Sequence, residues 1–203
     1  MINFVKIICN WLYRCVNLYV PAPMASFKFE EQKAVAALLY ICESYGGTCD
    51  KYAIMKILYL AERLHLSKYG RPITGDDFIT MKYGPVPTCT YDIIKSGASQ
   101  GKIFDHKYNN LIPVQKSDLD ELSGSDIECL NEVIAENTMH HFEIMKKKTH
   151  DAAFEKTKAE LGMGYSIPFL EIAKAGGAST EMLSYIEMQS QNLNCELNAP
   201  SNW

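Results

Sequence analysis

Residues 50–70 read DKYAIMKILYLAERLHLSKYG, and this stretch decides the fold class. Its apolar residues recur at helical spacing from Ile54 onward and form a wide face. Either Thr48 or Asp50 can cap the start of such a helix, and Gly70 is suited to end it. We therefore expect a buried helix. Its charged residues are expected on the other faces: Lys51, Lys56, Glu62, Arg63 and Lys68.

Helical spacing also precedes this stretch. Ala34, Leu38, Ile41 and Tyr45 recur at intervals of three or four, and the pair at 46–47 is Gly-Gly, which stops helices. These two helices are expected to pack together and to begin the core.

The segment after Gly70 changes period. Residues 78–83 alternate apolar and polar side chains, as a half-buried strand does. Pro85 and Pro87 fix φ and lack donors, so we expect neither a strand nor a helix to continue through them. A further helix is expected to start at Thr88 or Thr90.

Later residues predict a hairpin and more helices. Residues 102–106 and 111–114 flank Tyr108-Asn109-Asn110, and asparagine tolerates left-handed turn positions. Ser125–Glu128 matches a capping box, in which a serine and a glutamate bond each other's backbone amides. More helices are expected after Thr149-His150-Asp151, at Pro168, and at Ser179 or Thr180.

The whole pattern predicts a mainly α fold (α+β), with a small antiparallel β element between N- and C-terminal helices. We expect an apolar N-terminal extension at 1–24, one domain at 25–190 and a disordered tail at 191–203. The order of helices, strand and hairpin also loosely resembles a winged helix.

Composition limits the classes of function. The 203 residues carry a net charge of -4, whereas proteins that bind duplex DNA usually present a basic face. The cysteine count is seven, and no C-x-x-C pair occurs, so we expect reduced, mostly buried thiols. These features favour a cytoplasmic protein whose partner is not nucleic acid.

The first twenty residues are apolar but contain Lys6 and Arg14, which leaves no uncharged stretch long enough to cross a bilayer. As a helix, they would place a polar stripe beside an apolar surface, which suits a membrane interface or a partner. The alternative is that translation starts at Met24, after Pro21 and Pro23. We favour this second interpretation, so membrane contact is expected only through residues 1–20, if they are made.

Residues that could perform chemistry are few. Nucleotide-binding, zinc-protease and serine-hydrolase motifs are absent from the sequence. Adjacent His140 and His141 would point about 100° apart on a helix and seldom share one metal ion. His150 and Asp151 fit a helix start better than a metal site. A pair of Cys89 with His150 stays open as a nucleophile, although inert thiols are far commoner.

The most distinctive segment is residues 81–87, MKYGPVP. A rigid, proline-containing loop that projects Tyr83 and Val86 would lose little entropy on docking, so it could bind a protein. The alternative is that Pro85 and Pro87 only enforce a tight turn. Residue chemistry alone favours neither.

Three segments resemble the pattern of the SocA-like Panacea domain, a family of antitoxins: Lys56–Leu66, Tyr69–Asp76 and Met81–Pro87. The helix starts at 125–127 and 149–151, and the segment 171–177, are also similar to that pattern. The resemblance runs in consistent order over residues 26–188. Phe154 stands where the family pattern leads us to expect tryptophan, a conservative change.

This resemblance implies an antitoxin from a bacterial or phage-borne toxin–antitoxin pair, acting on a protein toxin encoded by a neighbouring gene. Members are associated with unrelated toxins, and one described mode delivers the toxin to a cytosolic AAA+ protease. The family is not known for catalytic residues, so we expect no catalytic, cofactor or metal site. The partner-binding surface is expected to be formed or supported by Arg71, Asp76, Tyr83, Gly84, Pro85, Val86, Pro87, His150 and Asp151.

Two other classes of function stay open. A winged-helix DNA-binding regulator would need a basic recognition helix, but Lys51, Lys56, Arg63 and Lys68 are interspersed with acids. A cysteine-dependent hydrolase would depend on Cys89.

Overall fold

A computed structural model describes residues 27–96, 103–137 and 142–197, the last six of them by their backbone alone. Its elements, in chain order, are α2 (Glu31–Ser44), β1 (Cys49–Asp50), α3 (Lys51–Tyr69), β2 (Phe78–Ile79), β3 (Val86–Pro87), α4 (Thr88–Ser96), β4 (Phe104–Lys107), β5 (Asn110–Pro113), η1 (Leu119–Glu121), α5 (Gly124–Glu136), α6 (Phe142–Thr149), α7 (Ala152–Leu161), α8 (Phe169–Ala175) and α9 (Thr180–Leu197). The prediction of a mainly α fold with small antiparallel sheets is confirmed.

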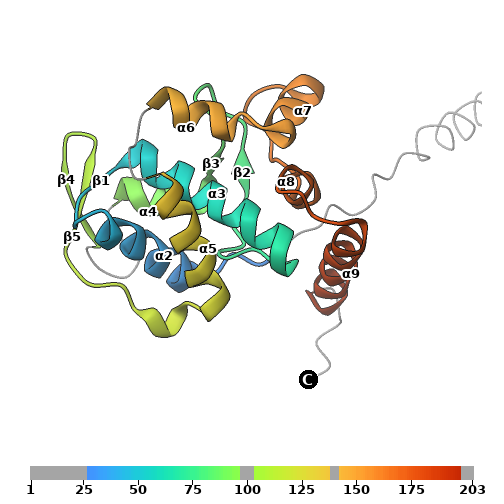
Figure 1. The fold of residues 1–203 in the computed structure, drawn as a ribbon, viewed down its shortest axis with the longest axis horizontal. Helices are drawn as coiled ribbons and strands as arrows, with labels where there is room; N and C mark the ends of the chain where they lie inside the picture. Colours follow the sequence, from blue (N-terminus) through green and yellow to red (C-terminus); the bar gives the residue numbers. More distant parts are fainter. Residues whose placement is uncertain (1–26, 97–102, 138–141, 198–203) are drawn as a thin grey trace, which may run out of the picture.

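Helix α3 lies at the centre of the molecule (Figure 1). It contacts α2, α5, α6, α8 and α9, and ten consecutive residues, 53–62, are buried. Asp50 caps it through the amides of Tyr52 and Ala53, and Gly70 ends it in a left-handed conformation, as predicted. Lys56 and Glu62 were expected on outer faces and are instead buried, because helices surround α3 on several sides.

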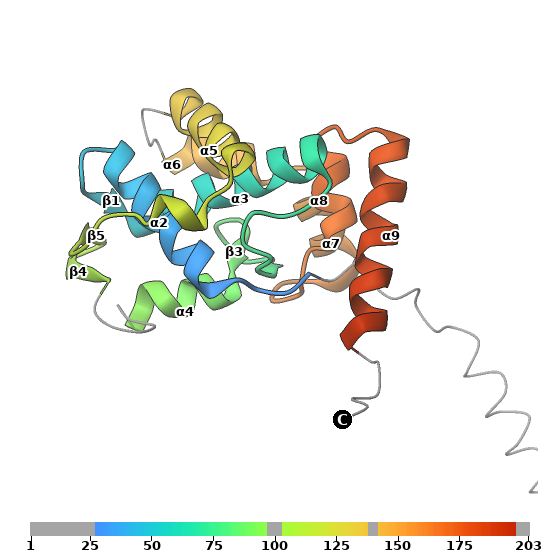
Figure 2. The ribbon, with the colours of Figure 1, turned by 90° about the horizontal axis from the view of Figure 1, so that it is seen from below.

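The two β elements lie at different places in the fold (Figure 2). In the sheet at one end, β5 lies between β1 and β4. If the hairpin of β2 and β3 between α3 and α4 is set aside, the order α2, β1, α3, α4, β4, β5 with this sheet resembles that of a winged helix. The predicted hairpin is confirmed, but its left-handed residue is Tyr108, with φ of 57°, and not an asparagine.

The second β element is the hairpin of β2 and β3, which pairs Phe78 with Pro87. Neither a strand nor a helix runs through both prolines, as predicted, but Pro87 is itself the last residue of a paired strand. The amide of Thr88 donates to the carbonyl of Asp77 at 2.9 Å, so Pro87 stands at a position where the antiparallel ladder needs no donor. The expected strand at 78–83 ends after Ile79, since Thr80 pairs with the backbone of Tyr165 instead.

One helix cap and one helix start differ from the prediction. Helix α4 begins at Thr88, as predicted, but its cap is the distant carboxylate of Asp76. The capping box of α5 is formed by Ser123 and Asp126, two residues earlier than predicted. A serine at either position fits the pattern, and the apolar residues behind it do not distinguish them.

Toward the C-terminus, α7, α8 and α9 begin close to the predicted positions. Helix α9 continues to Leu197, so residues 191–197 are helical and do not belong to the expected tail. The extension at 1–24 and the pair His140-His141 lie outside the described residues. Within the described part of the chain, no helix is long and apolar enough to cross a membrane.

Candidate functional site

The loop 83–87 comprises the end of the turn after β2 together with β3, and it lies over the N-terminal half of α3. Two side chains of α3 hold its backbone from below: the Nζ of Lys56 donates to the carbonyl of Pro85 at 2.6 Å, and the hydroxyl of Tyr52 donates to the carbonyl of Tyr83 at 3.1 Å. The turn is closed by the amide of Gly84, which donates to the carbonyl of Met81. The loop is therefore fixed by groups that are nonlocal in sequence.

Gly84 is the point where the loop meets the junction of α6 and α7. Its φ is +102°, and a Cβ added there would lie 2.9 Å from Oγ1 of Thr149, 3.2 Å from Nζ of Lys56 and 3.3 Å from Cδ2 of His150. Only glycine fits both this conformation and this space. The structure thus brings together two groups of predicted site residues, 83–87 and 150–151.

The exposed part of the loop is aromatic. Gly84, Pro85 and Pro87 are buried, whereas the side chain of Tyr83 is 47% exposed. Its ring lies 5.6 Å from that of Phe142, which in turn lies 4.6 Å from that of Tyr52. We call these three residues the aromatic patch. Sequence analysis missed Tyr52 and Phe142, because no local pattern links residues about ninety positions apart.

Asp151 connects α7 to α3. Its carboxylate caps α7 at the amide of Phe154 and accepts hydrogen bonds from the hydroxyl of Tyr59 and from Arg63, the latter at 2.7 Å. This network holds the junction of α6 and α7 in place beside the loop.

His150, the neighbour of Asp151, stacks on Phe154 with ring centroids 4.2 Å apart. Its Nε2 is buried and has no hydrogen-bond partner among the described residues, and burial lowers the pKa of the ring. The imidazole packs beside Gly84, and its Nδ1 lies 3.3 Å from Oε1 of Glu155.

Asp76 and Arg71 lie away from the aromatic patch. Asp76 is buried and accepts from the hydroxyl of Thr88 and the amides of Cys89 and Thr90, so it supports the hairpin and α4 from inside. Arg71 follows the opposite end of α3 from Tyr52, about 25 Å away at 1.5 Å per residue.

Arg71 belongs to a separate charged cluster at the start of α5. Asp126 accepts from Lys33 at 3.0 Å, His65 at 3.1 Å and Arg71 at 3.5 Å. Although burial of the Asp126 carboxyl opposes it, hydrogen bonds from His65, Ser123 and Lys33 hold its pKa well below the usual range. Both Ser125 and Asp126 contact Nε2 of His65, so the cluster lacks the relay geometry of a hydrolase triad.

The geometry around Cys89 gives little support to a cysteine-dependent hydrolase. Cys89 is exposed, but partial burial and the nearby negative charge of Asp76 raise the pKa of its thiol, which disfavours the reactive thiolate. Among the described residues, no group of three histidine, cysteine or acidic side chains could hold a metal ion.

The DNA alternative would need a basic recognition helix. Of the four basic residues named on α3, Lys56 is buried, Arg63 bonds Asp151 and Lys68 bonds Glu128 and Glu132, which leaves only Lys51 among these four. In α4, Asp76 occupies the first amides and Lys95 pairs with Asp92. Neither helix presents the free basic surface that phosphate binding needs.

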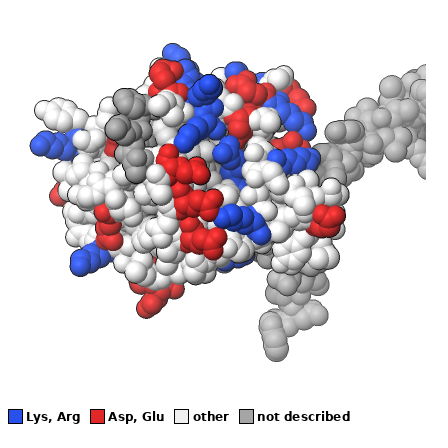
Figure 3. Space-filling model, viewed as in Figure 1, with Lys and Arg blue, Asp and Glu red and all other residues white. Residues whose placement is uncertain are grey.

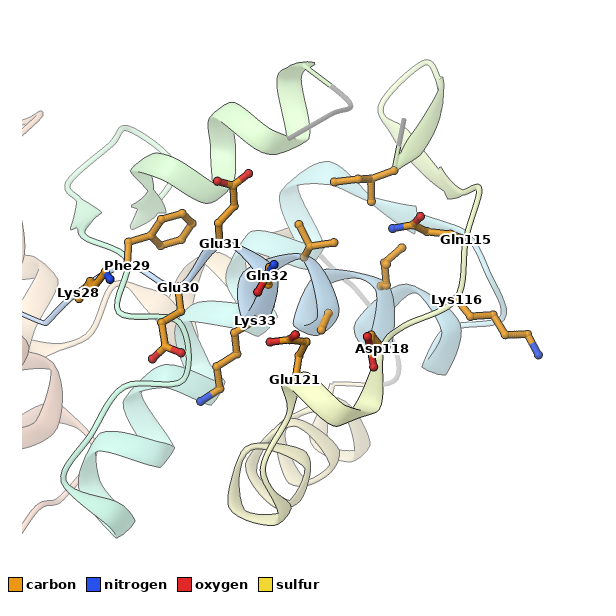
Figure 4. Close-up of a pocket in the computed structure, with 14 residues that line it drawn as sticks. Lys28, Phe29, Glu30, Glu31, Gln32, Lys33, Gln115, Lys116, Asp118 and Glu121 are labelled. Atoms are coloured by element: carbon orange, nitrogen blue, oxygen red, sulfur yellow. The ribbon is translucent and has the colours of Figure 1, made fainter. Parts of the chain in front are cut away.

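A separate groove of about 510 Å³ lies between α2 and the segment at 115–121 (Figure 4). Ala36, Leu39 and Ile103 line its apolar part, and Glu30, Glu31, Asp118 and Glu121 are among its charged residues. It contains none of the predicted site residues.

The loop at 83–87, its anchor Lys56 on α3 and the junction before α7 all fall within one stretch of sequence that a known family shares. The family described as Antitoxin SocA-like, Panacea domain, matches residues 54–155, half of the chain. The chain belongs to this family. The Panacea match covers α3 from Ile54 through the start of α7, and so includes Tyr83 and Phe142 of the aromatic patch and the network of Asp151, while Tyr52 lies two residues before it. No curated protein and no solved structure matches the chain.

Within this Panacea domain, Lys56 has an unusual environment. Burial lowers the pKa of its ammonium from 10.5 to about 7. Between these values the unfolded chain binds a proton that the folded chain lacks, so the free energy of unfolding rises with pH. We expect a rise of up to about 1.4 kcal/mol per pH unit between about pH 7 and 8.5. Urea unfolding at a series of pH values measures it.

The slope should disappear in Lys56→Met, which keeps the length and apolar packing of the side chain. It should persist in Lys95→Met, since the pKa of Lys95 is raised by Asp92 and lies above this range. His150 titrates below it, because burial lowers the pKa of its ring. An undiminished slope in Lys56→Met would assign the effect to another group.

Proposed function

We propose that this chain neutralises a cognate protein toxin by direct contact through the aromatic patch and the loop at 83–87. Membership of the antitoxin family supports a toxin partner in general. The observation that supports placing the toxin-binding surface here is the combination of a fixed backbone with exposed aromatic rings. Lys56 and Tyr52 hold the loop from below, while Tyr83 and Phe142 remain about half exposed.

Such an arrangement suits a binding surface. Aromatic side chains supply large contact area at low entropic cost, and interfaces depend on a few of them. A loop that is already fixed loses little further freedom on docking. Met81, which is 43% exposed next to the loop, adds an adaptable apolar contact.

Two finer aspects belong to the same proposal. The chain acts in the cytoplasm, and it either blocks the toxin or also delivers it to a cytosolic AAA+ protease. Both modes need a protein-binding surface and neither needs a catalytic group.

Co-expression with the neighbouring open reading frame tests the proposal. Bacterial growth is scored with the neighbour alone, with this chain alone and with both. We expect the neighbour to be toxic alone and harmless in the pair, and the two proteins to co-purify. Toxicity that persists at full expression of this chain would refute the cognate pair.

Steady-state toxin levels separate blocking from delivery, because delivery to a protease lowers the amount of toxin and blocking alone does not. In a host that lacks the protease, a blocking antitoxin still restores growth, whereas a pure adaptor does not.

A further inference from the structure

The aromatic patch is flanked by lysines. The Nζ of Lys82 lies 5.2 Å from the centroid of the Tyr83 ring, and that of Lys146 lies 6.0 Å from the centroid of the Phe142 ring. Lys82 is exposed and Lys146 is half-buried. The charges therefore stand beside the exposed rings that the proposed function uses.

The local charge differs in sign from that of the whole chain. Helix α6 and the hairpin tip at 81–84 carry Lys82, Lys146, Lys147 and Lys148 against Glu143 alone, a net charge of +3 in a chain of -4. The Nζ of Lys56 lies beneath, 5.0 Å from the centroid of the Tyr52 ring, but it is not counted in this charge because burial lowers its pKa to about 7. Asp50 is also near Tyr52, but its carboxylate caps α3.

The neighbouring surface on α5 has the opposite sign. Figure 3 shows blue side chains over α6 and a column of red ones along α5 below it. The exposed acids of that helix include Glu128, Glu132 and Glu136, and Lys68 pairs with two of them. The basic surface is thus bounded and localised at the patch.

We propose that the aromatic patch binds an acidic face of the toxin, on which an apolar side chain packs against Phe142 and Tyr83 and aspartate or glutamate side chains reach Lys82 and Lys146. This inference rests on the proposed function and adds the chemistry of the partner. Charge complementarity supports it, since opposite potentials steer encounter and fix the register of an interface.

The test is the association rate of the purified chain with its purified toxin, followed by stopped-flow fluorescence. Lys82→Glu/Lys146→Glu reverses both charges beside the rings. We expect association to slow by about 10- to 100-fold at low salt. The gap to the wild type should narrow as ionic strength rises, because salt screens exposed charges.

Lys95→Glu/Lys174→Glu is the matched control. It changes the net charge equally, and Lys95 also stands over a tyrosine ring, that of Tyr91 at 4.8 Å. Both control lysines are exposed and pair with a neighbouring acid on their own helix. This variant should associate at close to the wild-type rate.

An unchanged or faster rate in Lys82→Glu/Lys146→Glu would overturn the inference, as would equal slowing in both variants. The proposed function itself would survive those results if Tyr83→Ala/Val86→Ala still lost neutralisation. If that variant also bound normally, the patch would not be the contact surface. The two failures are therefore distinguishable.

Discussion

Tyr83→Ala/Val86→Ala is expected to abolish toxin neutralisation and to leave the helical content intact. The change removes the most exposed ring of the patch and the half-buried apolar side chain beside it. Truncation of central aromatic residues commonly costs more than about 2 kcal/mol of binding, a loss of at least about 30-fold in affinity. Growth rescue, pull-down of the toxin and far-UV circular dichroism measure the three quantities.

Tyr185→Ala/Met188→Ala is the matched control. These side chains are 42% and 51% exposed on α9, away from the patch, so the variant removes similar exposed apolar area. It should neutralise normally. If the loop variant also neutralises normally, the loop serves only as a turn between β2 and α4.

Gly84→Ala is expected to destabilise the protein by about 2 to 5 kcal/mol and to impair neutralisation. A positive φ costs a residue with a Cβ about 1–2 kcal/mol, and overpacking adds about 1–3 kcal/mol. The added Cβ would press on Thr149, Lys56 and His150. To relieve this overlap, the loop would have to move away from α3 and from the junction of α6 and α7. Urea unfolding measures the stability.

Comparison with Gly47→Ala separates the packing contribution at Gly84 from the conformational cost of a positive φ. Gly47 has a φ of +87°, but a Cβ there meets no atom within 4 Å. The free energy of unfolding of Gly47→Ala should therefore fall only by the cost of the positive φ, about 1–2 kcal/mol, and the variant should keep its neutralising activity. Equal destabilisation in the two variants would mean that the loop is not tightly packed at Gly84.

Much of the fold could be predicted because its determinants are local. The spacing of apolar residues, the cap at Asp50 and the glycine at position 70 fix α3 within a short stretch of sequence. The hairpin of β4 and β5 likewise follows from neighbouring residues. The Panacea resemblance, confirmed over residues 54–155, depended on three such contiguous segments.

The remaining features depend on contacts between distant segments. Asp76 caps a helix that begins twelve residues later, at Thr88. Glu62 accepts from the amides of Ile73 and Thr74, so a charged residue of α3 is buried by bonding to a turn beyond the end of that helix. Helical periodicity treats such residues as solvent-facing, because it contains no information on what covers each face.

The candidate site shows the same division. Sequence chemistry identified Tyr83 and the two prolines, since a rigid loop with an aromatic residue is visible in one segment. It assigned Lys56 to an outer face, although this side chain holds the loop at Pro85. Phe142 completes the patch only after α6 folds against α3.

Hydrogen exchange on the purified complex of this chain with its toxin tests the central claim most directly. We predict that toxin binding protects amides at 81–86 and 142–147, while α9 exchanges as in the free protein. Protection confined to α9, to the acidic surface of α5 or to the groove beside α2 would contradict the placement of the toxin on the aromatic patch.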